Sequence, residues 1–278
     1  MSEPRFAFGD NWRSFLQTLD EDRIAQADAS LTSLLKLDRA LDRPLRGKTF
    51  LDLGSGSGLF SLAAYRLGAD VLSIDFDPEC VACTEVLRDR YGDGQNRWQI
   101  RHGSVLDSQL MESLGRFDVV YSWGVLHHTG DMRRAIELAV DRVDQQGVLA
   151  IAIYNDQGGG SRRWLTIKRI YHRLPGPLRP VWVVAVASWY ELKFAVARLL
   201  RGKNPLPFSD WRQKKRDRGM SAWHDWVDWI GGLPFEVAKP ETILVPLAAQ
   251  GLSLVNLTTV GNGWGCNEYV LRRLPGGV

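Results

Sequence analysis

The chain has 278 residues, of which 45% are hydrophobic, and its formal net charge is +3. This length and apolar content exclude a largely disordered protein and allow one large domain, or one domain that carries a substantial insertion. The mild charge does not require nucleic acid as a partner. The three cysteines leave one unpaired in any disulfide arrangement, and Cys80 and Cys83 lack a second ligand pair, so no metal site is predicted.

The N-terminal residues hold an aromatic cluster, Phe6, Phe8, Trp12 and Phe15, ahead of a helix expected near Asp22–Leu41. The start of the chain lacks a positive stretch followed by an apolar one, so no secretory signal is expected. We therefore expect a cytoplasmic protein. The long apolar run 181–200 contains Glu191, Lys193 and Arg198, which disfavour a membrane-spanning helix.

A glycine loop lies between a predicted buried strand, Thr49–Leu53, and a predicted helix, Leu59–Arg66. Gly54, Gly56 and Gly58 permit positive φ there, and the next strand ends at Asp75, where nucleotide-binding α/β folds place a ribose-binding acid. A dinucleotide is disfavoured because its third glycine would fall at position 59, which is leucine. Asp52 repels phosphate and attracts an ammonium group, so the loop favours a nucleotide-like cofactor without a diphosphate.

Strands and helices alternate from residue 49 to residue 154, which predicts a parallel sheet with helices on both faces. The predicted strands are Thr49–Leu53, Val71–Asp75, Trp98–His102, Phe117–Tyr121 and Gly147–Ile153, and the predicted helices are Leu59–Arg66, Pro78–Tyr91 and Met132–Val143. Residues 155–235 are too long for a loop and predict a helical insertion. A helix over Glu241–Gln250 and strands over 252–257 and 268–272 follow.

Three motifs carry a resemblance to a known family: Asp52-x-Gly-x-Gly-x-Gly58, Phe117–Val120 followed by Val125–His128, and Gly147–Ile151. The chain resembles the class I S-adenosylmethionine-dependent methyltransferases, in the branch with quinone-biosynthesis methyltransferases, over residues 45–155 and again near the C-terminus. The resemblance implies an α/β fold with a doubly wound, seven-stranded, mostly parallel, Rossmann-like sheet, an antiparallel last strand and a helical insertion after the fifth strand. It divides the chain into a lid (1–45), a cofactor-binding core (46–154), an acceptor cap (155–235) and a sheet-completing segment (236–278).

The resemblance also implies which residues bind S-adenosylmethionine, with S-adenosylhomocysteine as product. The methionyl part would contact Asp52 and the loop residues Gly54, Ser55, Gly56 and Gly58, and the ribose would contact Asp75. The adenine would contact Phe76, Ser104 and Val105. Many relatives carry an acid at position 104, so Asp107 is a substitute candidate. Ser122 and Trp123 would border the transferable methyl group.

The candidate catalytic residues are His127, His128 and His224, because a histidine can remove a proton from an attacking hydroxyl or amine. The histidine pair can equally order its loop, and His224 can pair with Asp225 only if the insertion folds over the site. The candidate acceptor-binding residues are Trp12, Tyr154, Asn155, Trp223 and Asn267. Trp229, Cys266 and Glu268 could also line the acceptor side. The alternative for Trp223 and Trp229 is core packing, and the alternative for residues 266–268 is a role in the turn. No metal is required.

The sequence therefore predicts a methyltransferase that acts on an O, N or C atom of a small-molecule acceptor that is aromatic, apolar or acidic. The basic segments Arg162–Arg173 and Arg212–Arg218 keep two rivals open: a nucleic-acid methyltransferase and peripheral contact with an anionic membrane. The amino-methylating Asn/Asp-Pro-Pro-aromatic motif is missing after the fourth strand, which disfavours nucleic acid. A cofactor-binding protein without transfer and an oxidoreductase are further alternatives, and the oligomeric state is left open.

Overall fold

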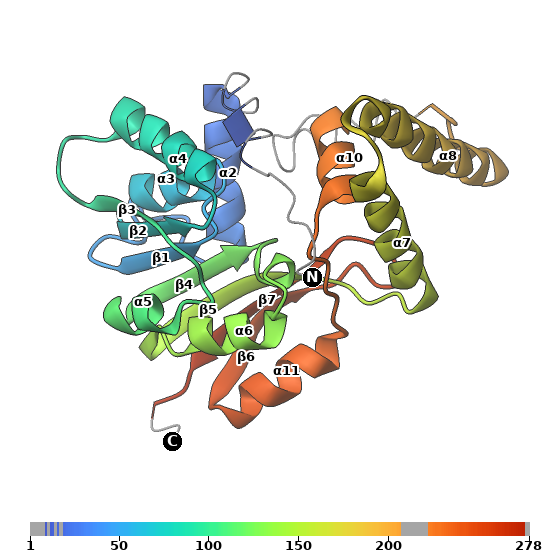
Figure 1. Ribbon diagram of the computed structural model, residues 1–278. Coiled ribbons are helices and arrows are strands. Elements are labelled where there is room, and N and C mark those ends of the chain that lie inside the picture. The colour runs from blue at the N-terminus through green and yellow to red at the C-terminus, as the bar shows by residue number, and fades with distance from the viewer. Residues whose placement is uncertain (1–8, 10–11, 14–15, 17–18, 207–221, 276–278) are drawn as a thin grey trace.

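The structure is a computed structural model that describes residues 9, 12–13, 16, 19–206 and 222–275. A seven-stranded sheet in the order β3-β2-β1-β4-β5-β7-β6 forms its centre (Figure 1). Strand β7 runs antiparallel to both of its neighbours, and the other pairs are parallel. This topology confirms the predicted fold class. The strands are β1 (Thr49–Leu53), β2 (Asp70–Asp75), β3 (Trp98–His102), β4 (Phe117–Trp123), β5 (Val143–Tyr154), β6 (Leu252–Thr258) and β7 (Cys266–Arg273).

Helices cover both faces of the sheet (Figure 1). One face carries α2 (Glu21–Leu34), α3 (Leu59–Arg66) and α4 (Pro78–Tyr91), and the other carries α5 (Ser108–Ser113), α6 (Met132–Val140) and α11 (Pro240–Ala249). Successive side chains of a strand point to opposite faces of the sheet. Phe50 therefore packs under α2, α3 and α4, and Leu51 packs on the opposite face with α5, α6 and α11. Asp77 caps α4, where its side chain accepts a hydrogen bond from the Glu79 N–H.

Helix α2 ends earlier than the sequence suggested. The expected helix ran to about Leu41, but α2 stops at Leu34 because Lys36 adopts a left-handed conformation, with φ of 55°. The Lys36 N–H donates to the Ser33 carbonyl and the Leu37 N–H to the Thr32 carbonyl. These two hydrogen bonds form a Schellman motif, which usually has glycine at the left-handed position. Here that position is lysine, so the sequence carried no indication that the helix ends there.

The boundary between α6 and β5 also differs. The helix expected over Met132–Val143 ends at Val140, and Val143 already pairs with Phe117 in the sheet. Apolar residues at 140 and 143 suit a helix and a strand equally well. Pairing with β4 decides between them, since the Phe117 N–H donates to the Arg142 carbonyl at 2.8 Å.

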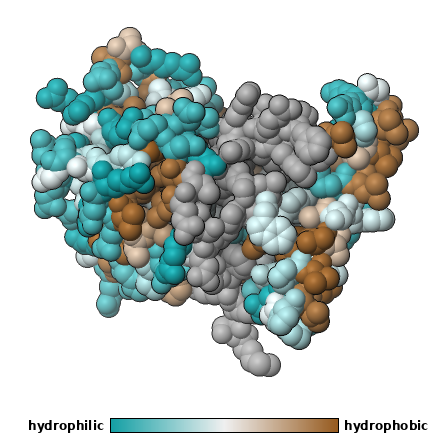
Figure 2. Space-filling model, turned by 90° about the horizontal axis from the view of Figure 1, so that it is seen from above, coloured by the Kyte–Doolittle hydropathy of each residue, from teal (hydrophilic) through white to brown (hydrophobic). Residues whose placement is uncertain are grey.

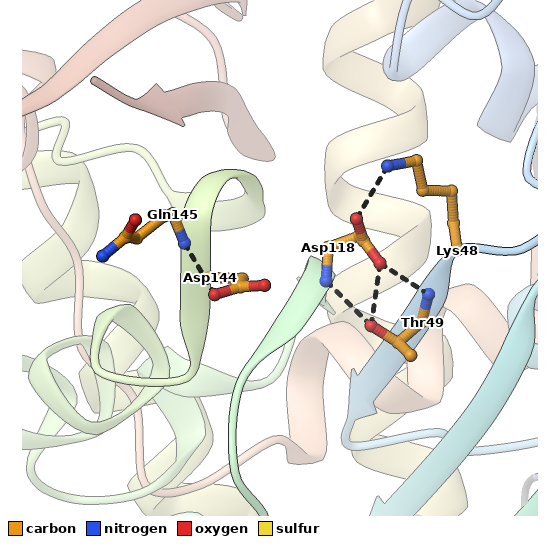
Figure 3. Close-up of polar contacts among 5 residues, drawn as sticks. All are labelled: Lys48, Thr49, Asp118, Asp144 and Gln145. Atoms are coloured by element: carbon orange, nitrogen blue, oxygen red, sulfur yellow. Dashed lines mark hydrogen bonds and ion pairs between the residues drawn. The ribbon is translucent and has the colours of Figure 1, made fainter. Parts of the chain in front are cut away.

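A polar cluster ties β1 to β4 at the edge of the sheet where both strands begin (Figure 3). The Asp118 carboxylate accepts hydrogen bonds from the Lys48 ammonium at 2.8 Å and from the Thr49 N–H at 2.9 Å. Partial burial raises the pKa of this carboxyl, but these hydrogen bonds outweigh burial and hold the pKa below its usual value. Asp118 is therefore placed to serve strand pairing, at the strand ends opposite to those that carry the glycine loop.

The insertion after β5 builds a third hydrophobic cluster of its own. Its helices are α7 (Gly159–Arg173), η2 (Gly176–Leu178), α8 (Arg179–Leu200) and α10 (Ala222–Gly231), and its buried centre includes Trp164, Val183, Val186, Trp226 and Ile230. Within the described residues, no helix combines the length and the apolar character needed to cross a membrane.

Candidate active site

The glycine loop joins β1 to α3 and bends under the end of β2. The N–H groups of Gly54 and Ser55 both donate to the Ile74 carbonyl, at 2.7 and 3.2 Å. Gly54 has a φ of 82°, and a Cβ there would lie 2.4 Å from the Val125 side chain. Glycine at position 54 is therefore needed for the turn, and also because the loop that follows β4 packs closely against this position through Val125.

Asp75 fastens this loop at the carboxyl end of β2. Its Oδ2 accepts a hydrogen bond from the Gly56 N–H at 2.9 Å, and its Oδ1 accepts one from the Asp77 N–H at 2.9 Å. Burial raises the pKa of Asp75, while these two hydrogen bonds act in the opposite direction. The carboxylate thus shapes the loop and at the same time lines the cavity above it.

Asp52 lies beneath the loop, with 2% of its surface exposed. It accepts a hydrogen bond from the Ser61 hydroxyl, which is linked to Ser73 at 2.7 Å, and Ser73 in turn accepts from the Trp98 ring N–H at 2.8 Å. Burial first, and then the charge of Asp75, raises the pKa of Asp52 to about 7. This carboxyl therefore titrates near neutral pH.

One cavity of about 1140 Å³ opens at the carboxyl ends of β1, β2 and β4 and is closed on one side by the insertion. In α/β sheets, ligands bind at this edge because the loops that follow the strands converge there. Twelve of the predicted site residues line the cavity: Trp12, Asp52, Gly54, Ser55, Gly56, Asp75, Phe76, Ser104, Val105, Trp123, His128 and Tyr154.

The two neighbouring histidines have different environments. His127 is fully buried outside the cavity wall, and its Nδ1 accepts a hydrogen bond from the Tyr154 N–H at 3.4 Å. His128 lines the cavity, and its Nδ1 lies 2.6 Å from the Pro234 carbonyl oxygen. Because a carbonyl only accepts, this Nδ1 must carry the proton, so Nε2 of the neutral ring is an acceptor. Burial and the nearby Lys168 ammonium lower the pKa of His128 to about 3, which keeps the ring neutral.

Helix α10 brings Asp228 and Trp229 to the cavity wall. Two side chains of α7 hold the end of α10: the Lys168 ammonium donates to the Trp229 carbonyl, and the His172 Nε2 lies 2.6 Å from the Gly231 carbonyl. The Lys168 ammonium suits this position because the C-terminus of a helix carries partial negative charge. Lys168 is fully buried, and burial lowers its pKa to about 7 against the opposing effect of Asp228.

Several predicted site residues are not part of the cavity wall: Gly58, Asp107, Ser122, His127, Asn155, Trp223 and Asn267. Gly58 and Asp107 are the N-cap residues of α3 and α5, and the Ser122 hydroxyl donates to the Leu53 carbonyl. Trp223 is 47% exposed to solvent. The side chain of His224, the cluster Phe6, Phe8 and Phe15, and the basic segment 212–218 lie outside the described residues.

The amides of Asn155 and Asn267 are engaged within the protein. Asn155 donates to the carbonyls of Gly261 and Gly263, and Asn267 donates to the Asn155 side chain at 3.1 Å. They hold the turn between β6 and β7 against the end of β5. The structure therefore places these two side chains in the support of a turn and not in the cavity wall, where an acceptor contact was expected.

Sequence reasoning missed Asp228 and Leu233, which the insertion brings to the wall. Trp229, Cys266 and Glu268, for which the sequence allowed either an acceptor-side position or a packing or turn role, line the wall as well. The alternation of side chains along β7 separates three neighbouring residues, since Cys266 and Glu268 share one face of the strand and Asn267 points to the other. No comparable signal existed for Asp228, because only the packing of α10 on α7 directs it toward the sheet.

Known proteins resemble this chain in sequence and in fold. A family model described as a methyltransferase domain matches residues 24–190. The ubiquinone biosynthesis O-methyltransferase of Azorhizobium caulinodans is 31% identical over 113 residues, which cover 41% of this chain and 43% of that protein. The enzyme of the same name from Pelagibacter ubique is 28% identical over 117 residues, covering 42% and 46%. The matched region thus spans about half the length of these curated relatives.

Among solved structures, magnesium protoporphyrin IX methyltransferase from Synechocystis, crystallised with bound SAH, matches with a TM-score of 0.54 at 15% identity and covers 95% of this chain and 93% of that chain. An O-methyltransferase family protein from Burkholderia thailandensis matches with a TM-score of 0.51 at 16% identity, covering 96% and 69%. These identities support a shared fold. Since the family match extends over residues 24–190, more than half of the 278 residues, the chain belongs to the methyltransferase domain family.

Proposed function

We propose that this protein binds S-adenosylmethionine in the cavity and transfers its methyl group to a small-molecule acceptor. The observation that carries the proposal is the meeting of Asp52, Asp75 and loop residues 54–57 in one cavity at the carboxyl ends of the strands. The volume of about 1140 Å³ exceeds the range of about 300–1000 Å³ usual for one small ligand, which leaves room for an acceptor beside the cofactor.

The residues present fit this cofactor better than a dinucleotide. Asp75 offers carboxylate oxygens to ribose hydroxyls, and Asp52 in its ionised form offers a negative charge to an ammonium group, whereas ionised carboxylates would repel a diphosphate. Phe76, Ser104 and Val105 line the same cavity and supply an apolar and polar edge for adenine. The cofactor, when bound, supplies an electrophilic methyl group on a sulfonium.

The part of the wall built by α10 and by the adjoining ends of β5 and β7 sets the acceptor chemistry. Asp228 and Glu268 bring carboxylates to it, and Tyr154 and Trp229 bring aromatic rings whose centroids are 4.8 Å apart. Two carboxylates disfavour the acidic acceptor that the sequence allowed. We therefore propose an acceptor that is neutral or cationic, carries hydroxyl or amino groups, and has an apolar face to pack against the rings.

His128 is the histidine that we propose to contact the acceptor. Its Nδ1–H is committed to the Pro234 carbonyl, so Nε2 can accept a hydrogen bond from the hydroxyl or amine that attacks. A pKa of about 3 makes the ring a weak base, so its contribution is orientation of the nucleophile more than full proton removal. Tyr154, whose ring centroid lies 5.3 Å from that of His128, packs beside it.

Titration calorimetry with S-adenosylhomocysteine tests the cofactor site. Wild-type protein is expected to bind it, and Asp75→Asn to weaken binding by about tenfold to a hundredfold, because one charge-assisted contact is lost. Asp118→Asn is the matched control: it alters an aspartate at the opposite edge of the same sheet and should bind normally. Binding of NAD in place of S-adenosylhomocysteine would instead establish an oxidoreductase.

Methyl transfer is tested by following S-adenosylhomocysteine production with panels of polyols, amines, phenols and carboxylic acids. Turnover is expected with the neutral or amino acceptors and not with the acids. Cofactor binding without product on any panel would show a binding protein that does not transfer. Turnover on RNA or DNA with steep salt dependence would favour the nucleic-acid alternative.

A further inference from the structure

Helix α8 presents an apolar face to solvent. Val183 and Val186 point inward to the cluster of the insertion, while the side chains on the opposite side are exposed, with Leu192 at 58% and Leu199 at 64%. With about 3.6 residues per turn, the exposed apolar residues fall on one side of the helix. They are Val181, Val184, Trp189, Leu192, Val196, Leu199 and Leu200, which together we call the α8 face.

An exposed helix side of this kind is unusual. A surface helix normally turns a polar face to water, and contiguous exposed apolar patches mark interaction sites. Figure 2 shows apolar side chains gathered at the right-hand edge of the molecule, the side on which Figure 1 places α8. The left-hand side, over the helices α2 to α4, is mostly hydrophilic in the same view.

The α8 face lies in the most basic part of the described chain. Residues 159–206 hold ten arginines and lysines and a single acid, Glu191, a net charge of +9. The whole chain carries +3, so the remaining residues carry a net charge of −6. Exposed members include Arg162, Arg163, Arg169, Arg173, Lys193, Arg201 and Lys203. The Lys193 ammonium lies 4.9 Å from the Trp189 ring centre, so a cation borders the apolar face directly.

The positive charge around the α8 face distinguishes between the partners that could bind it: a second copy of this chain, nucleic acid or a membrane. Two copies joined through it would bring two segments of +9 together, and nucleic acid would leave the aliphatic side chains without a partner. An anionic bilayer surface satisfies both features: aliphatic and tryptophan side chains enter the boundary between headgroups and acyl chains, and lysine and arginine attract the anionic headgroups. We propose that the α8 face docks this protein on membranes that contain anionic lipid.

Vesicle co-sedimentation of the full chain without cofactor tests this proposal separately from methyl transfer. Wild-type protein is expected to bind vesicles of phosphatidylcholine mixed with phosphatidylserine, to bind vesicles of phosphatidylcholine alone at least about tenfold more weakly, and to dissociate as salt is raised. The variant Leu192→Glu/Leu199→Glu should lose binding by about tenfold or more, since it puts two like charges at the lipid boundary.

The matched control is Val86→Glu/Val245→Glu, which adds the same charges at two similarly exposed valines, 55% and 66%, on α4 and α11. It should bind like the wild type. The milder Leu192→Ser/Leu199→Ser should lie between, and thermal melting verifies folding of each variant. Equal vesicle binding by the α8 variant and the wild type, or no binding by the wild type, overturns the proposal. So does a wild-type dimer that the α8 variant converts to monomers, because the face would then join two copies.

Discussion

The buried carboxyl of Asp52 is expected to make the stability of the ligand-free protein depend on pH. Its pKa is raised from 3.8 to about 7, so the folded state holds the proton more tightly than the unfolded state does. This contribution to stability is fully present below the unfolded pKa and is lost as pH rises through about 7. At about 1.4 kcal/mol per pKa unit the limiting effect is about 4 kcal/mol, of which about 2 kcal/mol falls between about pH 5.5 and about pH 8.

Asp52→Asn isolates this effect, because asparagine stays neutral and its oxygen can still accept the Ser61 hydrogen bond. Urea unfolding of both proteins at the two pH values gives the free energy of unfolding in each case. The variant is expected to gain about 2 kcal/mol over the wild type on going from the lower to the higher pH. Other titrating groups, such as His128, occur in both proteins and cancel. A difference between the two proteins that stays constant with pH would refute the reasoning.

Three further outcomes are expected. Gly54→Ala should lower the free energy of unfolding in urea by about 2–4 kcal/mol, because alanine is strained at positive φ and its Cβ would clash with Val125. Gly115→Ala is the control: Gly115 has a similar φ of 78° but no atom within 4 Å of the added Cβ, so the loss should be about 1 kcal/mol. Equal losses for the two variants would exclude the clash. His128→Asn retains a donor for the Pro234 carbonyl and should keep its melting temperature but lose about tenfold to a hundredfold in turnover, while unchanged turnover would remove His128 from the reaction. Lys168→Met should raise the pKa of His128 above about 3, since it removes a neighbouring positive charge; an unmoved imidazole titration by NMR would contradict that electrostatic coupling.

Much of the sheet could be predicted because its signals are local. β1, β3, α3 and α4 have the bounds that the sequence indicated, since apolar runs, an N-cap and a glycine turn mark their ends. The ends of α2 and α6 could not be predicted, because one depends on a lysine in a left-handed conformation and the other on pairing with β4.

The candidate site divides in the same way. By itself, the sequence determined the glycine loop with Asp52 and Asp75, because these residues lie at the carboxyl ends of consecutive strands and meet wherever parallel strands end together. Tertiary structure alone decided that His128 lines the cavity while His127 is buried, and that Asp228 and Trp229 complete the wall. Neighbouring residues on a short helical turn point in different directions, and the packing of α10 on α7 joins segments about sixty residues apart in the chain, so neither outcome has a local pattern to read.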